Sequence, residues 1–377
     1  MRIGIDSLFI RPGKVGGTES YLRNLLKALE IVDQENEYII FTSRNNDASF
    51  TFENKNFRKV LCDLDNDSRF KRMIYTSSNL PKLIEKEKID VMFFPSYMRS
   101  FTKLKKVKTV SNVHDIQYKH YPEYFSLSKK LIFNVFYPAS IYKSDHIVCI
   151  SQYVKDDILN YFSNVPSEKL SVIHNPIDFD KFSKNVNGQE LISKWGLQKG
   201  NYILSVASHV PHKNMETLIK AFAELKSKHQ TNQKLVLVGI KDKSTGKMVE
   251  LLKECNIFDE TIVPGFVNDE TLSQLYNNAS VFVSTSLFEG FGMPPVEAMY
   301  RNVPTITTKC ASLPEVTQNS AVYYNNPTDY HELAQTIQKV LLSPPDISDM
   351  PEKLVESYSF EVIGQKYKEL FEMVSKR

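Results

Sequence analysis

The chain is predicted to fold as an α/β protein with two doubly wound parallel sheets. Short apolar segments of strand length alternate with longer segments of helical periodicity through both halves of the sequence. This alternation is typical of parallel sheets that carry helices on both faces. A polar stretch near 174–199 separates the two series, and 377 residues suit two domains of ordinary size better than one.

The first half begins with a strand and continues with strands and helices in turn. Strands are predicted over Ile3–Asp6, Tyr38–Thr42, Lys59–Cys62, Val91–Phe94, Thr109–Val113 and His146–Ile150. Apolar side chains at helical spacing predict a first helix that ends near Ile31 and is capped by the hydroxyl of Thr18. Further helices are predicted near 70–87, 125–142 and 152–161.

The second half repeats this architecture without a sequence repeat. Strands are predicted over Tyr202–Val206, Lys234–Val238, Thr261–Val263, Val281–Ser284 and Thr305–Thr307. Helices are predicted near 214–228, 245–256, 269–277, 294–300 and 329–342. We place the first domain at 1–178, the second at 179–357, and a last helix at about 358–377.

Composition predicts a cytoplasmic protein. The cysteines Cys62, Cys149, Cys255 and Cys310 are far apart and form no CxxC pair, which argues against a disulfide framework or a zinc site. The chain starts directly in a strand pattern, so we expect no signal peptide. Because no window approaches the roughly 18 apolar residues of a membrane-spanning helix, none is expected.

The segment FEGFGMPPVEAM, at 288–299, carries the most specific pattern in the chain. An apolar run before it predicts a buried strand, and Pro294 suits the first turn of a helix, where a missing N–H costs nothing. Glycines between strand and helix let the backbone approach a ligand and leave amides free to donate. Glu289 is therefore expected at the carboxyl end of a strand and Glu297 one turn into the next helix, at the edge where open sheets bind ligands.

This segment resembles the Glu-x7-Glu signature of the retaining glycosyltransferases of family 4, which have the GT-B fold of two Rossmann-like domains with a cleft between them. The resemblance implies a nucleotide diphospho-sugar in the C-terminal domain and an acceptor in the N-terminal domain. Glu297 would accept hydrogen bonds from ribose hydroxyls and Glu289 from the donor sugar. Amides of Phe291 and Gly292 would face the sugar or diphosphate, and Met293 belongs to the same donor-binding group. The last helix would cross back to the first domain.

The segment SHVPHKN, at 208–214, resembles the phosphate-binding element of this family. Lys213 would neutralise the leaving diphosphate next to a helix N-terminus, which also favours an anion; a solvated lysine in a first turn is the alternative. Many members carry an arginine where this chain has Ser208. His209, assigned with Ser208 to the donor site, or His212 can compensate only in part, because a neutral imidazole contributes less than a guanidinium.

The N-terminal half carries two shorter elements that resemble parts of the family site. Gly16 and Gly17 match its glycine loop, whose amides would touch the diphosphate across the cleft; a plain turn is the other interpretation. His114 follows a predicted strand and would hydrogen-bond a sugar hydroxyl near the reaction centre. Asp115 would orient the imidazole or bind the acceptor, and a structural His–Asp contact is the alternative.

Two polar loops bear on where a nucleotide base would bind and on whether a metal ion is required. The segment 264–270 resembles a family loop whose backbone at Phe266 and Val267 holds the nucleotide base. Asp63, Asp65 and Asp67 spell D-x-D, which binds a divalent metal in other transferases, but they fall in a polar loop that we interpret as solvated. The resemblance therefore implies transfer without a metal or a further cofactor.

A basic and aromatic segment at 97–143 carries nine Lys/Arg against two Asp/Glu, which gives +7 in a chain whose net charge is +3. Such a segment can dock on an anionic membrane surface, bind nucleic acid, or form a solvated edge beside a buried helix. No recognition motif supports nucleic acid, so we expect none as a partner. The membrane interpretation implies a peripheral protein on the inner face of the cytoplasmic membrane.

These features together predict a hexosyltransferase of cell-surface polysaccharide or lipopolysaccharide synthesis. The donor would be a nucleotide diphospho-sugar, with GDP-mannose, and hence mannosyltransferase activity, slightly favoured over a UDP-sugar. The acceptor would be a glycan or a lipid-linked glycan. Two alternatives stay open: a GT-B sugar-nucleotide epimerase, and a non-catalytic GT-B scaffold that binds nucleotide without turnover.

Overall fold

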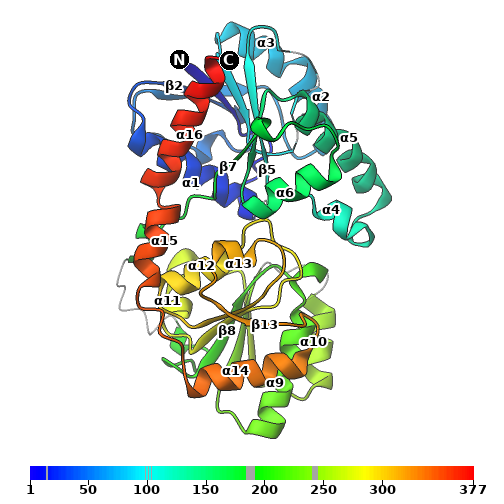
Figure 1. The fold of residues 1–377 in the computed structure, drawn as a ribbon, viewed down its shortest axis with the longest axis vertical. Coiled ribbons are helices and arrows are strands. Elements are labelled where there is room, and N and C mark those ends of the chain that lie inside the picture. The colour runs from blue at the N-terminus through cyan, green and yellow to red at the C-terminus, as the bar shows by residue number, and fades with distance from the viewer. Residues whose placement is uncertain (14–15, 98, 101, 103, 184–191, 240–244) are drawn as a thin grey trace. The chain divides into compact units, whose positions relative to one another are not determined.

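The computed structural model describes residues 1–13, 16–97, 99–100, 102, 104–183, 192–239 and 245–377 (Figure 1). The chain divides into two compact units, and each is described by itself. Unit 1 comprises Met1–Ile177 and Ser357–Arg377, and unit 2 comprises Asp178–Glu356. The predicted domains met after residue 178, and the last helix belongs to unit 1.

Unit 1 contains a seven-stranded parallel sheet in the order β3-β2-β1-β4-β5-β6-β7. Its strands are β1 (Arg2–Asp6), β2 (Glu37–Ser43), β3 (Phe57–Cys62), β4 (Val91–Phe94), β5 (Lys108–Val113), β6 (His146–Cys149) and β7 (Leu170–Val172). The strand order reverses between β1 and β4, and such a reversal is where open α/β sheets bind ligands. The sequence did not predict β7, because three residues are too few to show a pattern.

The helices of unit 1 lie on both faces of this sheet (Figure 1). They are α1 (Gly17–Val32), α2 (Arg69–Ser78), α3 (Leu80–Lys86), α4 (Gln117–His120), α5 (Leu127–Lys143), α6 (Gln152–Tyr161) and α16 (Phe360–Ser375). Helix α16 packs closely on α1, since a Cβ at Gly364 would lie 2.7 Å from the carbonyl oxygen of Ala28. Both helices contribute to one apolar cluster with β1 and β2.

Two predictions for these helices were wrong in detail. Helix α1 begins at Gly17 with Gly16 as its N-cap, at φ 73°, so Thr18 lies inside the first turn and does not cap it. The predicted helix over 70–87 is two helices that break at Asn79. Pro81 has no N–H to donate to Ser77, whose carbonyl instead accepts the Thr102 hydroxyl at 2.5 Å.

Unit 2 contains a six-stranded parallel sheet in the order β10-β9-β8-β11-β12-β13. Its strands are β8 (Tyr202–Val206), β9 (Lys234–Val238), β10 (Thr261–Gly265), β11 (Val281–Ser284), β12 (Thr305–Thr308) and β13 (Val322–Tyr324). Its helices include α9 (Met215–His229), α10 (Thr245–Glu254), α11 (Asp269–Asn277), α12 (Met293–Tyr300), α13 (Leu313–Val316) and α14 (Tyr330–Leu342). Helix α15 (Met350–Tyr358) leads back to unit 1.

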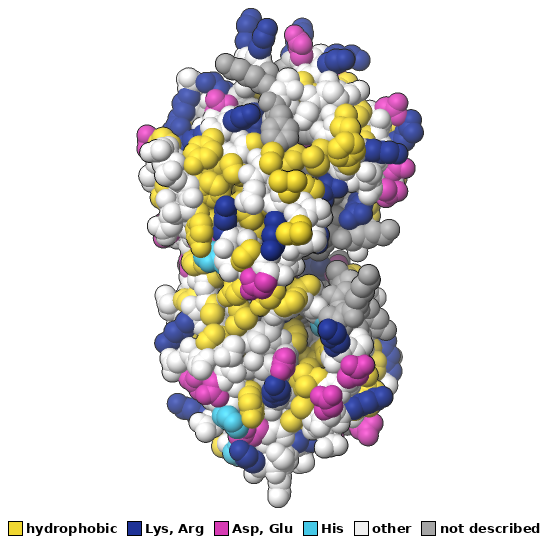
Figure 2. Space-filling model, turned by 90° about the vertical axis from the view of Figure 1, so that its right-hand side faces the viewer, with side chains coloured by type: hydrophobic (Ala, Val, Ile, Leu, Met, Phe, Trp, Pro, Cys, Tyr) yellow, Lys and Arg dark blue, Asp and Glu magenta, His cyan; other side chains and the backbone are white. Residues whose placement is uncertain are grey.

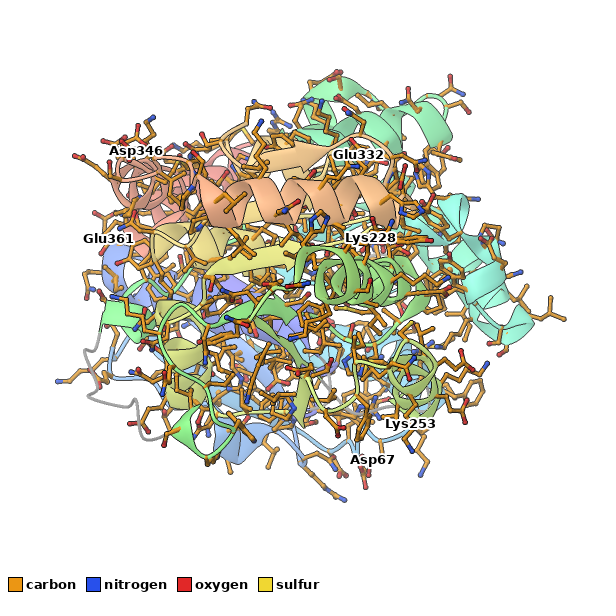
Figure 3. All side chains as sticks on the ribbon, turned by 90° about the horizontal axis from the view of Figure 1, so that it is seen from below. Asp67, Lys228, Lys253, Glu332, Asp346 and Glu361 are labelled. Atoms are coloured by element: carbon orange, nitrogen blue, oxygen red, sulfur yellow. The ribbon has the colours of Figure 1, made fainter. Side chains whose placement is uncertain are left out.

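Two apolar clusters sandwich the unit 2 sheet. Along β8, Ile203 joins the cluster with α9, α10 and α14, while Tyr202 and Leu204 join the cluster with α11 and α12. This follows from the alternation of side chains along a strand. Charged side chains such as Lys228, Lys253 and Asp346 are exposed on the outside (Figure 3). Among the described residues of the whole chain, no helix has both the length and the hydrophobicity to cross a bilayer.

Candidate active site

The polar loops of unit 2 meet where the order of its sheet reverses. Strand β8 ends at Val206 and its neighbour β11 ends at Ser284, so the loops at 207–214 and 285–292 leave the same edge of the sheet. The sequence predicted Lys213 in the first loop and Glu289 in the second. Parallel strands bring their carboxyl ends together, and this edge is the expected ligand site of the sheet.

Lys213 and Glu289 form an ion pair at this edge. The Lys213 Nζ lies 2.5 Å from the Glu289 Oε1, and the Ser286 hydroxyl donates to the same oxygen at 2.8 Å. Their side chains retain 16% and 15% exposure, so both remain accessible to a small ligand. Burial raises the pKa of Glu289, but the charge and hydrogen bond of Lys213 outweigh it and hold that pKa below its ordinary value. Glu289 is therefore a carboxylate at neutral pH.

Hydrogen bonds between the two loops fix this pair. The amide of Leu287 donates to the His212 carbonyl at 2.7 Å, and the Thr285 hydroxyl donates to the Lys213 carbonyl at 2.8 Å. Because both bonds hold the backbone on either side of the Lys213 side chain, the ammonium is positioned before any ligand arrives. Such prior positioning is what electrostatic stabilisation of a leaving group requires.

The glycine loop after Glu289 is held by Ser312, the N-cap of α13. The Ser312 hydroxyl donates to the carbonyls of Glu289 and Phe291 at 2.9 and 3.1 Å. Gly292, at φ 93°, is the N-cap of α12, and a Cβ there would lie 2.9 Å from Leu313 Cδ2. Glycine is thus required by both conformation and space. Met293 is the first residue of α12, and Pro294 lies in the first turn of this helix, as the sequence predicted.

Glu297 lies one turn into α12, as predicted. Its Oε2 accepts the hydroxyl of Tyr276 at 2.9 Å. Burial raises the pKa of Glu297 above its ordinary value, although this hydrogen bond opposes the shift. Within the described residues, its Oε1 has no hydrogen-bond partner, which leaves one carboxyl oxygen for a ligand hydroxyl.

The loop after β8 carries Ser208 and two histidines close to Lys213 in the sequence. Ser208 is half-buried and His209 is buried at 5% exposure. Burial and the charge of Lys213 lower the pKa of His212 to about 4, so this imidazole is neutral at physiological pH. Neither His212 nor Ser208 therefore supplies a second positive charge beside Lys213, and any help from His212 is limited to hydrogen bonding.

The loop that follows β10 presents an aromatic side chain. Phe266 is 74% exposed, which is unusual for so large an apolar residue. Val267 beside it packs against the cluster under α11 and α12. The loop leaves the same edge of the sheet as the loops of Lys213 and Glu289, so a ligand there can reach an exposed ring.

Unit 1 has a cavity of about 330 Å³ at its own reversal of strand order. It is lined by residues of the loops that follow β1, β3, β4 and β5, by residues of the first turns of α1 and α2, and by one residue of α5. These are Phe9, Arg11, Thr18, Asn66, Asp67, Arg69, Arg72, Ser96, Tyr97, His114, Asp115 and Tyr137. The predicted His114 and Asp115 are among them, whereas Gly16 and Gly17 are exposed beside Thr18.

The imidazole of His114 is held in one orientation. Its Nε2 lies 2.9 Å from the carbonyl oxygen of Pro95, and its ring meets that of Tyr21 edge to face at 4.8 Å. The Pro95 carbonyl only accepts, which assigns the proton to Nε2 and leaves Nδ1 as an acceptor, while the side-chain amide of Asn112 lies 3.2 Å from the same Nε2. Burial lowers the pKa of His114 to about 4, which keeps it neutral at pH 7. Asp115 accepts from the amide of Gln117 at 2.9 Å.

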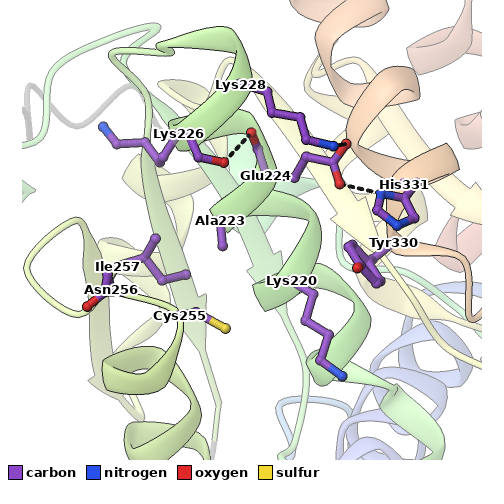
Figure 4. A pocket seen from close by; sticks show the side chains of 11 residues that line it. Lys220, Ala223, Glu224, Lys226, Lys228, Cys255, Asn256, Ile257, Tyr330 and His331 are labelled. Atoms are coloured by element: carbon purple, nitrogen blue, oxygen red, sulfur yellow. Dashed lines mark hydrogen bonds and ion pairs between the residues drawn. The ribbon is translucent and has the colours of Figure 1, made fainter.

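Another cavity, of about 640 Å³, belongs to unit 2 (Figure 4). It lies among α9, α10 and α14 rather than at the loops after β8 and β11. Its polar side chains pair with one another. The Glu224 carboxylate contacts both Lys228 and His331, and Lys220 forms an ion pair with Glu216. It does not gather the residues that the sequence singled out.

Several residues of the site were not predicted. Tyr276, Ser286 and Ser312 orient the two glutamates or their loop, yet each is an ordinary polar residue in its own sequence context. Ser286 stands between the β11 strand pattern and Glu289, and Ser312 begins a segment, 312–316, that resembles a family loop of the second domain, so these two gave a signal. Arg11 and Arg69 gave none, since their approach depends on which strands are neighbours.

Two parallel sheets of Rossmann-like order, each with a polar site at its strand ends, define the class of GT-B glycosyltransferases. Two family models match the chain in succession: "Glycosyltransferase Family 4" over residues 15–181 and "Glycosyl transferases group 1" over residues 188–358. The chain belongs to these family 4 glycosyltransferases and is an enzyme of that kind. The recognition made from Glu289 to Glu297 is confirmed at the level of the family.

Among curated proteins, the chain is similar to the O-antigen chain mannosyltransferase RfbU of Salmonella typhimurium, with 31% identity over 67% of this chain and 66% of RfbU. It is also similar to the serotype-specific mannosyltransferase WbdA of Escherichia coli, with 30% identity over 54% of this chain and 25% of WbdA. The chain thus spans about two thirds of the first protein and a quarter of the second.

Solved structures share the fold. A sucrose-phosphate synthase from Thermosynechococcus elongatus aligns with a TM-score of 0.80 at 18% identity, over 99% of both chains. HepE of Anabaena, in complex with UDP and glucose, aligns with a TM-score of 0.76 at 17% identity, over 99% of this chain and 100% of HepE. At such identities the likeness concerns the fold alone, and it agrees with the predicted GT-B class.

Proposed function

We propose that this protein is a retaining hexosyltransferase that uses a nucleotide diphospho-sugar, GDP-mannose being favoured, to extend a glycan or lipid-linked glycan of a cell-surface polysaccharide. The observation that carries the proposal is the Lys213–Glu289 pair at the strand ends of unit 2. In this reading Lys213 turns to the leaving diphosphate, whose negative charge grows as the glycosidic bond breaks. Glu289 then accepts from a hydroxyl of the donor sugar.

The remaining residues have matching roles in this proposal. Glu297 offers its open Oε1 to a ribose hydroxyl, and Phe266 and Val267 lie at the base. The Nδ1 of His114 accepts from a sugar hydroxyl on the side of unit 1. Lys213 supplies the charge that a metal ion supplies in other transferases, so we expect transfer without an added metal.

The donor is inferred from relatives. RfbU and WbdA are named mannosyltransferases, which favours GDP-mannose, while the HepE complex with UDP and glucose keeps a UDP-sugar open. Their names also support O-antigen or lipopolysaccharide synthesis as the setting.

A thermal-shift screen tests the proposed donor site. We expect GDP or UDP to raise the melting temperature of the full chain, because a ligand at 100 times its Kd stabilises by about 2.7 kcal/mol. Glu297→Ala should lose most of this shift, since it removes the oxygen that meets the ribose. Glu250→Ala, at an exposed position of α10, is the matched control and should keep it.

The screen also separates the alternatives. Nucleotide binding followed by consumption of the nucleotide sugar without an acceptor would favour an epimerase. Binding without turnover would favour a scaffold. The absence of a shift with every nucleotide would contradict the proposed donor site and point to Ser208 as the reason.

We also propose that α5 docks on the anionic inner face of the cytoplasmic membrane. Leu127, Leu131 and Val135 recur every four residues and are 83%, 69% and 49% exposed. Lys129 and Lys130 flank them on the same helix. Figure 2, which faces the side of α5, shows hydrophobic side chains beside Lys and Arg over unit 1. Such a surface suits anionic lipid, at about 1 kcal/mol per basic residue.

The structure changes how the basic segment at 97–143 is interpreted. Tyr118, Phe136 and Tyr137 are buried, so the aromatic residues belong largely to the core and leucines form the surface instead. Phe101 and Lys103 of this segment lie outside the described residues.

Pelleting with lipid vesicles tests this surface. The protein should bind phosphatidylglycerol vesicles at low salt, bind phosphatidylcholine vesicles weakly, and be released by salt. Leu131→Glu should reduce binding roughly tenfold, because it places a charge in the apolar stripe and repels the lipid. The matched control is Leu342→Glu on α14, at a residue 79% exposed, which should bind as the wild type does. Equal binding by both variants would contradict the role of α5.

A further inference from the structure

The cavity of unit 1 contains three arginines that the reaction as proposed does not use. Arg11 follows β1, and Arg69 and Arg72 lie one turn apart on α2. Within the described residues, Arg11 and Arg69 form no ion pair or hydrogen bond, although both are half-buried. Elsewhere in unit 1 arginines are engaged, as Arg58 is by Glu37 and Glu87.

These guanidinium groups repel one another. Burial lowers the pKa of Arg72, the charges of Arg69 and Arg11 lower it further, and the buried Asp6 opposes this. Asp6, whose pKa burial raises to about 6, is still largely a carboxylate at neutral pH and offsets the charge of Arg72, which leaves Arg11 and Arg69. Placing like charges in one cavity costs free energy that an anionic ligand would return.

Two acidic residues, Asp67 and Asp115, line the cavity, so its lining carries three arginines against two aspartates. Asp67 is exposed at the rim, where it points outward (Figure 3), and Asp115 accepts from the amide of Gln117. Behind them, Asn66 is buried and donates to the carbonyls of Leu8 and Ile10 at 2.9 and 2.7 Å, which shapes the loop that carries Arg11. Hydrogen bonds from Asn66 therefore hold the loop of Arg11 in place at the cavity.

We infer that this cavity binds an anionic group, a phosphate or a carboxylate, carried by the acceptor. Arginine matches both groups, since its planar fork donates two parallel hydrogen bonds to a pair of oxygens. The cavity of about 330 Å³ also holds His114, whose Nδ1 accepts from a hydroxyl, and the stacked rings of Tyr97 and Tyr137. A sugar that bears a phosphate or carboxylate satisfies all three features together.

This inference rests on the proposed function, because it assigns the anion to the acceptor rather than to the donor. It makes the acceptor a charged molecule, such as a glycan with a uronic acid or a glycan on a lipid phosphate. Both carry the same chemistry at the arginines, and the probes below distinguish them. A neutral glycan would offer no anionic group to pair with the guanidinium groups of these arginines.

Binding of inorganic phosphate and of methyl glucuronide to the full chain tests the inference at constant ionic strength. We expect at least one of them to bind, and Arg11→Gln and Arg69→Gln each to raise its dissociation constant roughly tenfold or more, as the loss of a charge-assisted hydrogen bond implies. Methyl mannoside, which is neutral, should gain nothing from the arginines. Preference for phosphate would indicate a phosphate-linked acceptor, and preference for the glucuronide an acidic sugar.

Two control variants locate the bound anion. Lys71→Gln removes an exposed charge from the same helix and should leave binding unchanged. Lys213→Ala removes the donor phosphate site of unit 2 and should also leave it unchanged. Binding lost in Lys213→Ala but kept in both arginine variants would assign the anion to the donor and overturn the inference, as would a failure of both probes to bind.

The test remains distinct from that of the proposed function. Anion binding that depends on Arg11 and Arg69 supports the anion site even if no nucleotide sugar is turned over, and that outcome would count against the transferase proposal alone. If Arg69→Gln does not fold, the half-exposed Arg11→Gln carries the test. In active enzyme, both variants should raise the KM for acceptor and leave the KM for donor unchanged.

Discussion

Lys213→Ala is expected to lower the kcat of transfer by roughly 10²–10³, the usual cost of removing a group that stabilises developing charge. The fold should survive, since Lys213 lies at the sheet edge with 16% exposure and packs in neither core cluster. The measurement is initial-rate kinetics with the nucleotide sugar that binds best, alongside thermal unfolding of the same preparations.

A double variant separates catalysis from structural pairing. Lys213→Ala leaves Glu289 as a carboxylate whose remaining donor, among the residues that the structure describes, is Ser286, so some stability is lost. Lys213→Ala with Glu289→Gln removes that unpaired charge and should restore stability but not activity. Lys220→Ala, which breaks the exposed pair with Glu216 on α9, is the control and should leave kcat unchanged. Recovery of activity in the double variant would mean that Lys213 serves only to balance Glu289.

The sequence predicted that Lys213 and Glu289 lie at one edge of the unit 2 sheet because each stands in a short loop after a strand. Lys213 stands seven residues after the end of β8, and Glu289 five residues after the end of β11. In a doubly wound sheet those two ends are neighbours, so a strand pattern and a loop were enough to bring the pair together. Ser208, where many family members carry an arginine, was noticed because the segment 208–214 resembles the family's phosphate-binding element.

The cavity of unit 1 could not be predicted in this way. Arg11, Arg69 and His114 are separated by many residues and by several strands, and each alone looks like a surface charge or a structural imidazole. They meet only because β1, β4 and β5 are adjacent and α2 begins beside them. The helix break at Asn79 was missed although Pro81 follows two residues later, and the three-residue strands are too short to show a pattern.

Gly239→Ala should have the largest effect on stability of any single-methyl change in unit 2. A Cβ on Gly239 would lie 1.9 Å from the carbonyl oxygen of Ala207, which is backbone and cannot rotate away. The two residues are tied to the sheet, because Ala207 donates to Val238 at 2.9 Å and Gly239 donates to Gly265 at 3.1 Å. We expect a loss of about 3 kcal/mol in the free energy of unfolding, the upper end for overpacking.

The same clash should reach the active site, because Ala207 starts the loop that carries Lys213. Chemical denaturation measures the stability loss, and kinetics should show a kcat lower than the fraction of folded protein explains. Gly246→Ala is the matched control: nothing lies within 4 Å of its Cβ and it sits in α10, so it should be neutral or stabilise by up to about 1 kcal/mol. If Gly239→Ala were as stable and active as Gly246→Ala, the loops after β8 and β9 would not be held as closely as the Lys213–Glu289 geometry requires. Gly239 would then have no part in positioning the Lys213 ammonium that the proposed reaction needs.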